Sequence, residues 1–398
     1  MLTSAVLTLC LAGAWGLASP ETVIATLDRV GAGDLVLLND PLGTRPVRVL
    51  LATRTTAAAS KVRAMLTDPA SYGRAMPSFR RIDVLGTRTR GPGVTDLEIA
   101  WELEVPLWNL QGKLWLKPQP DGVDLELADG DFAPGLFHIR AREDGAARTV
   151  LVIEGFANVR EANWATRRLA KRSPLAEPAI SVAATYVMLK ALAQQAERGA
   201  YMRPSGPLVA PSLATLYGVP VGAAAEAFSA AHQVLAVVRS RADGRLARVE
   251  VAVDAAASEA VVSVRRTQPQ VFTSFPGWHK VTPSSDKPDE CRDTTASCWI
   301  VESNLPFFSL DGTWKIWPRP WRALTVLGDG QGAIMALDVL PGKVADHSTV
   351  VLSQHPRMDK AGYVARKLIA AEPFLEHGLA LALTLIDAVA LAPALARP

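Results

Sequence analysis

The side chains of this chain that could do chemistry do not form any of the common catalytic patterns. There is no Gly-x-Ser-x-Gly elbow, HExxH pair, Walker loop, GxGxxG turn or CxxC pair. The six histidines are not clustered at metal-ligand spacing. His347 and His355 bracket the predicted strand VVLSQ and are typical of solvated strand ends. The sequence therefore predicts no catalytic residue, no metal and no cofactor.

A few carboxylates remain as candidates for proton transfer. Glu98, Glu102 and Glu104 alternate with apolar residues, so we expect them to face solvent. Glu154 lies in VLVIEGF. If Val150 and Val152 face an internal cavity, the alternation of a strand places the Glu154 side chain on the same side. There it could anchor a polar group or act as a general acid or base with a raised pKa. The simpler interpretation is that a local twist or bulge turns it outward.

The N-terminal residues have the composition of a secretory signal. No charged side chain precedes Glu21, the preceding stretch is apolar, and Gly16 and Ala18 are small residues of the kind that signal peptidases require. We expect residues 1–19 to be a signal peptide and the protein to be exported, either periplasmic or secreted. A buried N-terminal helix is the alternative, because MLTS contains no Lys or Arg.

Removal of a signal peptide would take Cys10 with it and leave Cys291 and Cys298 as the remaining thiols. They lie in the polar stretch KPDECRDTTASCW, where a turn could bring them together. An even pair in an exported chain is a candidate disulfide. Two unpaired thiols in a cytosolic protein are the competing interpretation, and a zinc site would need ligands that no nearby histidine supplies.

One unusual segment occurs twice in the chain. PLWNLQGKLWLKPQP at 106–120 matches PFFSLDGTWKIWPRP at 306–320, and paired residues such as Gly112 and Gly312 stand 200 positions apart. A second pair of similar segments, 164–178 and 363–377, is separated by an offset of 199. A period near 200 indicates two complete folds. We expect an N-terminal segment at 20–33, one domain at 34–198, a Pro/Gly-rich linker at 199–232 and a second domain at 233–393.

The sequence of the first copy predicts an antiparallel sheet covered by a helix. Two strands are followed by two short helical stretches, the second opening at Asp68, a favourable N-cap. Six alternating stretches joined by short turns then predict six antiparallel strands. A long helix follows, with an apolar stripe that includes Val182 and Tyr186. The second copy repeats this plan, and its final helix is apolar enough to suggest a membrane span, although its match to the first copy favours a packed helix.

This order of elements resembles the helix-grip fold of the START-like superfamily, which includes lipid-transfer START domains and polyketide cyclases. The entrance segment LTDPASYGRAMPSF at 66–79 is similar to the stretch that precedes the second strand in that superfamily. RTQPQVFTSFPGW at 266–278 keeps the aromatic residue and Pro276 but lacks the Asp. The resemblance implies an α+β fold: two tandem helix-grip domains, each a curved antiparallel sheet wrapped around a long C-terminal helix.

The resemblance also implies a ligand cavity between helix and sheet in each copy, because a concave sheet gripped by one helix leaves an apolar space with few polar groups. The residues expected to line these spaces are apolar or aromatic and face inward: Tyr72, Met76, Phe79, Trp101, Leu103, Leu110, Leu114, Leu125, Val182 and Tyr186 in the first copy, and Phe272, Trp278, Leu310, Trp314, Leu381 and Leu385 in the second.

Composition is consistent with a binding protein. With 49% hydrophobic residues each half can bury a core, and a net charge of +3 without a basic run excludes a nucleic-acid footprint. The leading hypothesis is non-catalytic binding, transport or sequestration of a hydrophobic small molecule or lipid, with transient membrane contact as a possibility. The alternatives are a polyketide cyclase or aromatase-like enzyme using the same cavity, and a degenerate second copy that supports the first.

Overall fold

The computed structural model describes residues 18–39, 47–105, 108–145, 148–159, 175–204, 206–208, 233–275, 278–283, 299–303, 312–318, 324–328, 333–356, 358–360 and 363–397. Most of the predicted signal peptide and of the predicted linker falls outside these residues. Cys291, Cys298 and Leu310 also lie outside them, so the disulfide and the role of Leu310 stay predictions.

The first copy has the predicted order of elements. Two strands lead into two short helices, a six-stranded antiparallel meander follows, and a long helix ends the copy. The elements are β1 (Asp34–Asn39), β2 (Arg48–Thr55), α3 (Ala59–Thr67), α4 (Pro69–Ala75), β3 (Phe79–Gly91), β4 (Val94–Val105), β5 (Trp108–Gln119), β6 (Gly122–Gly130), β7 (Phe132–Glu143), β8 (Thr149–Asn158) and α6 (Ala176–Arg198).

The start of α4 follows from its sequence. The Asp68 side chain accepts a hydrogen bond from the backbone N–H of Ala70, and Pro69 occupies the first helical position. Asp68 also accepts hydrogen bonds from Ser71 and Arg74. The predicted N-cap is therefore confirmed, and it fixes the entrance segment of the first copy.

The second copy repeats the first: β9 (Gln233–Ser240), β10 (Leu246–Ala255), α9 (Glu259–Arg265), the 3₁₀ helix η1 (Pro269–Ser274), β11 (Trp278–Pro283), β12 (Trp299–Ser303), β13 (Gly312–Pro318), β14 (Leu324–Gly328), β15 (Ala333–Pro341), β16 (Ser348–Pro356), η2 (Met358–Lys360), α11 (Tyr363–Ala371) and α12 (Leu375–Ala396). The predicted α+β fold of two tandem helix-grip units is confirmed by this order and by the long helix that packs on each sheet.

The two copies share one continuous antiparallel sheet of 16 strands, which the sequence did not predict. Its order is β11-β12-β13-β14-β15-β16-β10-β9-β1-β2-β8-β7-β6-β5-β4-β3. The copies join through β1 and β9, where Val36 lies opposite Ala236. Because these residues are 200 positions apart (36 + 200 = 236), each is the repeat of the other, and the junction has the symmetry of a twofold axis.

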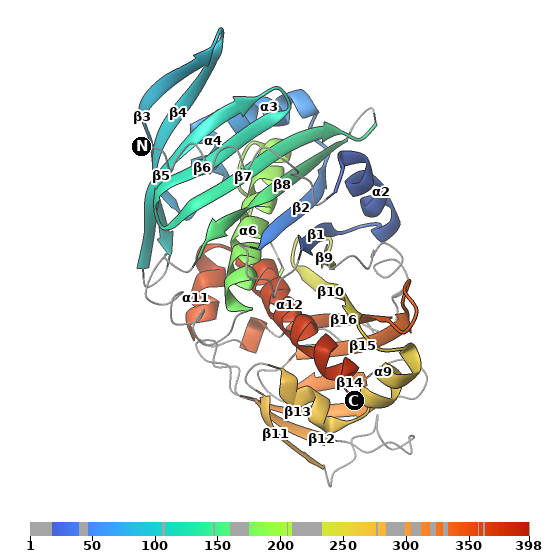
Figure 1. Cartoon of the computed structure of the whole chain (residues 1–398). Helices are drawn as coiled ribbons and strands as arrows, with labels where there is room; N and C mark the ends of the chain where they lie inside the picture. Colours follow the sequence, from blue (N-terminus) through green and yellow to red (C-terminus); the bar gives the residue numbers. More distant parts are fainter. Residues whose placement is uncertain are drawn as a thin grey trace, which may run out of the picture.

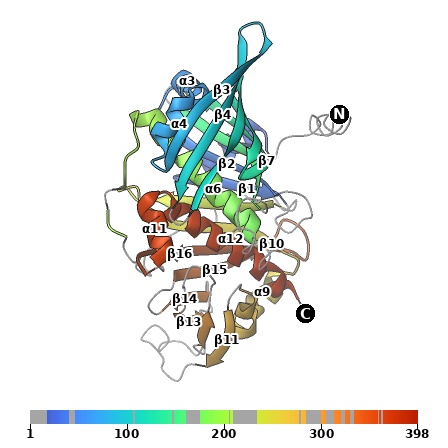
Figure 2. The same ribbon diagram turned by 90° about the vertical axis from the view of Figure 1, so that its left-hand side faces the viewer.

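The sheet is covered on both faces at this junction. On one face α6 and α12 lie side by side and pack against β2 and β10 (Figure 1, Figure 2). On the opposite face lies α2 (Pro20–Val30), capped by Ser19. Its apolar side packs on buried residues of both copies, including Leu35 from β1 and Val237 from β9. The paired strands are therefore buried from both sides, as their continuous apolar sequences require.

The final helix, α12, is the one helix among the described residues that is long and apolar enough to cross a membrane by length and composition. In the structure it packs on β10, β16 and α6, and residues such as Leu381, Leu385 and Leu391 are fully buried. The core of the second copy thus accounts for its apolar composition, as the match to the first copy predicted.

The two long helices approach each other closely at Gly378. A Cβ atom at this position would stand 2.9 Å from the backbone oxygen of Ala183. That distance is shorter than a real carbon–oxygen contact allows, so only glycine permits this helix spacing without a shift of one backbone.

We predict that Gly378→Ala destabilises the protein by about 1–3 kcal/mol because of this overpacking. In the absence of the contact, alanine would stabilise a helix by about 1 kcal/mol relative to glycine. Gly73→Ala in α4 is the matched control, because a Cβ there would meet Ile82 at 3.6 Å, an ordinary contact. Urea denaturation measures both variants, and equal stabilisation by the two substitutions would contradict the close helix contact.

Candidate binding cavity

An apolar cavity of about 150 Å³ lies in the first copy between α6 and the meander. Residues from the α4 region, from strands β3 to β8 and from one side of α6 surround it. The described lining residues are Pro69, Tyr72, Met76, Phe79, Ile82, Ile99, Trp101, Leu103, Leu114, Leu116, Leu125, Leu127, Phe132, Phe137, Ala157, Val159, Ser181, Ala184, Thr185 and Met188. None of these side chains carries a charge, so the cavity suits an uncharged occupant.

Seven of the ten residues expected in the first copy lie on this wall, because the period-two alternation of the strands places them inward. They are Tyr72, Met76, Phe79, Trp101, Leu103, Leu114 and Leu125. Leu110 is buried on the same face of β5 but lies outside the lining. Whether a ligand touches these residues stays a prediction.

Val182 and Tyr186 are fully buried but do not line the cavity. Their stripe of α6 faces the rest of the core, and Tyr186 reaches β1 and α12. The neighbouring stripe faces the cavity through Ser181, Ala184 and Thr185. Sequence reasoning missed this second stripe because its residues are small or polar, yet their helical spacing was a usable signal.

Trp101 is held in place by its neighbours on the sheet. Its indole stacks on the ring of Phe132, with centroids 6.5 Å apart and planes 9° from parallel. Phe132 itself adopts a positive φ of 71°, an uncommon conformation for a residue with a side chain. Gly112 lies opposite Trp101 on β5, and a Cβ there would come within 2.9 Å of the indole. The glycine of the repeated segment thus makes room for a cavity wall.

Most polar groups of the cavity wall are satisfied within the protein. The Tyr72 hydroxyl donates to the backbone oxygen of Leu66 at 2.9 Å, and the Thr185 hydroxyl donates to that of Ser181 at 2.7 Å. Two polar atoms have no partner: the hydroxyl of Ser181 and the indole N–H of Trp101. Both residues are buried, with exposed fractions of 4% and 6%.

Glu154 does not face the cavity. Leu151 and Ile153 of β8 belong to the core around α6, whereas Val150 and Val152 pack on the other face with α2. Glu154 shares the face of Val150 and Val152, so it points away from the cavity. It faces outward because of its alternate position along β8 and not because of a bulge. The general acid or base hypothesis for this residue is therefore wrong.

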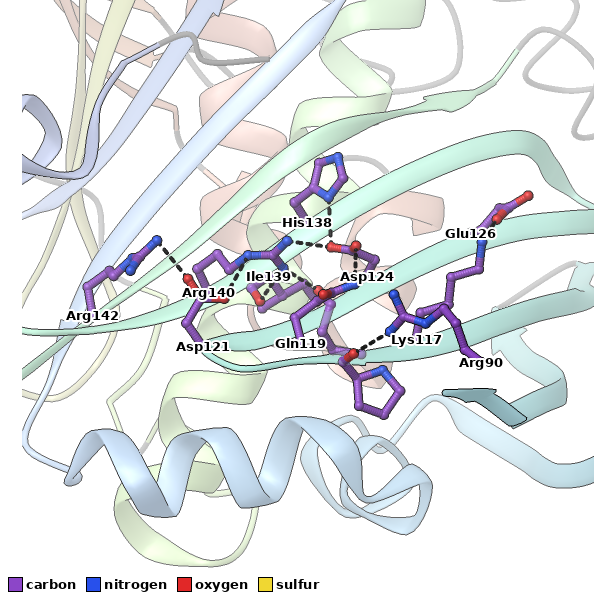
Figure 3. Close-up of polar contacts among 12 residues, drawn as sticks. Arg90, Lys117, Gln119, Asp121, Asp124, Glu126, His138, Ile139, Arg140 and Arg142 are labelled. Carbon is purple, nitrogen blue, oxygen red and sulfur yellow. Dashed lines mark hydrogen bonds and ion pairs between the residues drawn. The ribbon is translucent and has the colours of Figure 1, made fainter. Parts of the chain in front are cut away.

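The outer face of the meander carries a network of ion pairs (Figure 3). Asp124 lies 2.7 Å from the imidazole Nδ1 of His138 and 2.6 Å from the guanidinium of Arg140, which also pairs with Asp121. Burial alone would raise the pKa of Asp124, but the bonds to His138 and Arg140 hold it below its usual value. These cross-strand contacts explain the polar side of the alternation, and they lie on the face opposite the cavity.

In the second copy, the described side chains that were expected to line a cavity belong to the packed core. Phe272, Leu381 and Leu385 are buried in the core, and Phe272 packs edge-on against Phe275. Trp278 and Trp314 lie in β11 and β13, and their side chains are outside the described part. Among the described residues no group of acids, histidines and cysteines could hold a metal ion.

A buried carboxyl lies inside the second copy. Asp387 of α12 stands 199 positions after Met188, which lines the first cavity, and Gln354 of β16 stands 199 after Gly155. The Gln354 amide donates to Asp387 at 3.5 Å. Burial raises the pKa of Asp387 to about 7, and the bond from Gln354 offsets this only in part. The second interior thus contains an ionisable group that the first lacks.

A polar cluster links the two copies at their junction. Buried Asp34 of β1 accepts hydrogen bonds from Thr53 and from the Tyr186 hydroxyl at 2.6 Å, and forms an ion pair with Lys190 at 3.0 Å. Burial would raise the pKa of Asp34, but Lys190 and the two hydroxyls together hold it below its usual value. The Tyr186 ring stacks on His377 of α12, with centroids 6.0 Å apart.

The second copy replaces this polar cluster with apolar residues. The repeat offset is 200 for β1 and β2 and 199 for α6. The counterparts of Asp34, Thr53, Tyr186 and Lys190 are therefore the buried residues Val234, Val253, Leu385 and Val389. One framework therefore accommodates either a satisfied ionic cluster or an apolar one.

No protein-family model and no curated protein matches the chain. Among solved structures, the aromatase/cyclase Zhui of Streptomyces sp. R1128 is 18% identical and matches 38% of this chain and 93% of its own, with a TM-score of 0.31. The di-domain ARO/CYC BexL is 10% identical over 88% of this chain and 99% of its own, with a TM-score of 0.26. The lipid transfer and protein localization domain of human StarD13 is 11% identical over 42% of this chain and 85% of its own, at 0.29. These values are low, so the fold assignment rests on the topology described above.

We predict that Asp34→Val alone destabilises the protein by about 3–5 kcal/mol, because it leaves the Lys190 ammonium and two hydroxyls without their acceptor. The quadruple variant Asp34→Val, Thr53→Val, Tyr186→Leu and Lys190→Val reproduces the second copy and should recover most of this loss. Urea denaturation followed by circular dichroism compares the two. A quadruple variant less stable than Asp34→Val would contradict the account.

Asp387 should make stability depend on pH. Because its folded pKa of about 7 exceeds the ordinary value of 3.8, the unfolded chain releases this proton first, and stability falls as pH rises between those values. Asp387→Asn should therefore match the wild type near pH 4 and exceed it above pH 7.5, by on the order of 1–4 kcal/mol. Asp346→Asn, at an exposed position, is the control. A difference independent of pH would refute the buried-carboxyl assignment.

Proposed function

We propose that the first copy binds a small hydrophobic molecule in its internal cavity and so carries or sequesters it. The observation that supports this most strongly is the apolar, uncharged cavity of about 150 Å³ between α6 and the meander. Protein interiors are normally packed without such voids, and an unfilled one costs stability. Ala184 is an exposed residue of an otherwise buried stretch of α6, because its methyl group faces this space.

The size of the cavity favours a compact ligand. An apolar protein cavity of about 150 Å³ is large enough for benzene, whereas sites for drug-sized ligands measure about 300–1,000 Å³. A single ring or a short branched chain fits the space as it stands. A sterol, hopanoid or complete acyl lipid would require the wall residues to move, or would insert only one end.

Binding without catalysis is favoured in this copy, since acid–base catalysis needs an ionisable group near the substrate. Of the described lining residues only Tyr72 can ionise, and burial together with the charge of Asp68 raises its pKa far above neutral. The observation that favours the cyclase-like alternative is Asp387 of the second copy, a buried carboxyl whose pKa burial raises to about 7. Conversion of a polyketide-like substrate by the wild type and not by Asp387→Asn would support that alternative.

The binding proposal predicts that a compact apolar probe such as toluene binds the wild-type protein and that Ala184→Phe weakens this binding at least tenfold, because the new ring occupies the cavity. Isothermal titration calorimetry or ligand-observed NMR measures the affinity. Ala64→Phe adds the same ring at an exposed position of α3 and should leave binding unchanged.

Native mass spectrometry of the freshly purified protein provides an independent check, with a co-purified small apolar molecule as the expected result. Repeated recovery of empty protein, together with no binding across a panel of compact hydrocarbons and lipids, would refute the proposed function.

A further inference from the structure

We propose that the ligand of the first cavity is a compact apolar molecule carrying an uncharged oxygen that accepts hydrogen bonds, such as a ketone, ester, ether or quinone. This inference rests on the proposed function and specifies its ligand class. It follows from two unpartnered polar atoms that belong to residues of the cavity wall, the Ser181 hydroxyl on α6 and the Trp101 indole N–H on β4.

The Ser181 hydroxyl is not used as helical hydroxyls ordinarily are. A serine or threonine inside a helix usually donates to the backbone oxygen four residues earlier. Thr185 does so, to Ser181 at 2.7 Å, and Thr384 in the second copy does so to Ala380, also at 2.7 Å. Ser181 makes no such bond and lies on the cavity wall. Its repeat counterpart is Ala380, so this hydroxyl is present in the first copy and absent from the matching position of the second.

The indole N–H of Trp101 likewise has no hydrogen-bond acceptor. A buried tryptophan N–H usually finds an acceptor, and leaving it without one costs about 1–3 kcal/mol. The stack on Phe132 and the close approach of Gly112 restrict its movement toward another acceptor. A ligand oxygen that reaches the indole N–H from the cavity would supply the missing hydrogen-bond acceptor.

The Ser181 hydroxyl and the Trp101 indole N–H restrict which functional groups the ligand can carry. The indole can only donate, and a hydroxyl can donate or accept, so the complementary ligand group is an acceptor. A pure hydrocarbon would leave both groups unsatisfied. A carboxylate or phosphate would be buried against described lining residues that include no cation, which is unfavourable. A neutral carbonyl or ether oxygen on an apolar body meets both conditions.

The test compares acetophenone with α-methylstyrene, which has nearly the same shape but a CH₂ group in place of the carbonyl oxygen. Affinities for both are measured by calorimetry on the wild type, Ser181→Ala and Trp101→Phe. The ratio of the two affinities is compared between proteins, so that differences in transfer from water cancel. We expect each variant to reduce the preference for acetophenone about 3- to 10-fold, the effect of one lost hydrogen bond.

Two further measurements separate recognition from a structural role. Thr384→Val removes a helical hydroxyl outside the cavity and should leave the ratio unchanged. Without ligand, Ser181→Ala should melt no lower than the wild type, because the hydroxyl it removes is unpaired. A lower melting temperature would assign Ser181 to the fold and overturn its role in recognition.

The outcomes distinguish this inference from the function on which it rests. If the wild type binds both molecules and neither cavity variant changes the ratio, the ligand class is wrong while hydrophobic binding stands. If the wild type binds neither molecule and no other compact probe, the proposed function fails and this inference fails with it.

Discussion

The pairing of β1 with β9 is the constraint on which the rest of the structure depends. It joins two sheets at the residues that are repeats of each other, Val36 and Ala236, and removes the edge that either copy would otherwise expose. Both long helices are thereby brought to one face, where Gly378 allows them to touch. The Asp34 cluster and the packing of α2 across both copies both lie at this junction. The copies therefore share one continuous sheet and one hydrophobic core.

A shared framework has left the two interiors free to diverge. The first copy keeps its ionic cluster at the junction and a hollow, uncharged space around Trp101 and Ser181. The second copy fills the junction positions with Val and Leu and carries Asp387 inside. Exchanges at single inward positions, Met188 for Asp387 and Gly155 for Gln354, change the chemistry of an interior within the same order of strands. The duplication thus gives one sheet two cores of different chemistry.

The sequence predicted the fold well where the physics is local. Period-two alternation identified the six strands of the first copy and the inward set that includes Trp101 and Leu114, and Asp68 was recognised as a cap. It did not predict what depends on three-dimensional placement. The β1–β9 pairing requires knowledge of which edges meet, and the orientation of α6 requires knowledge of which of two adjacent stripes faces the sheet. Glu154 shows the same limit, because the phase of β8 is set by pairing with β2 and β7.

The central claim is that the first copy is hollow although its wall is made of large side chains. The stack of Trp101 on Phe132 and the bulk of the meander around it keep the wall from collapsing into the space. A crystal structure determined under xenon pressure tests this most directly, because xenon occupies dry apolar cavities of this size. The account predicts a xenon peak, or density for a compact bound molecule, between α6 and the meander. Rotation of Trp101 or Met188 into the space, with no xenon bound, would contradict it.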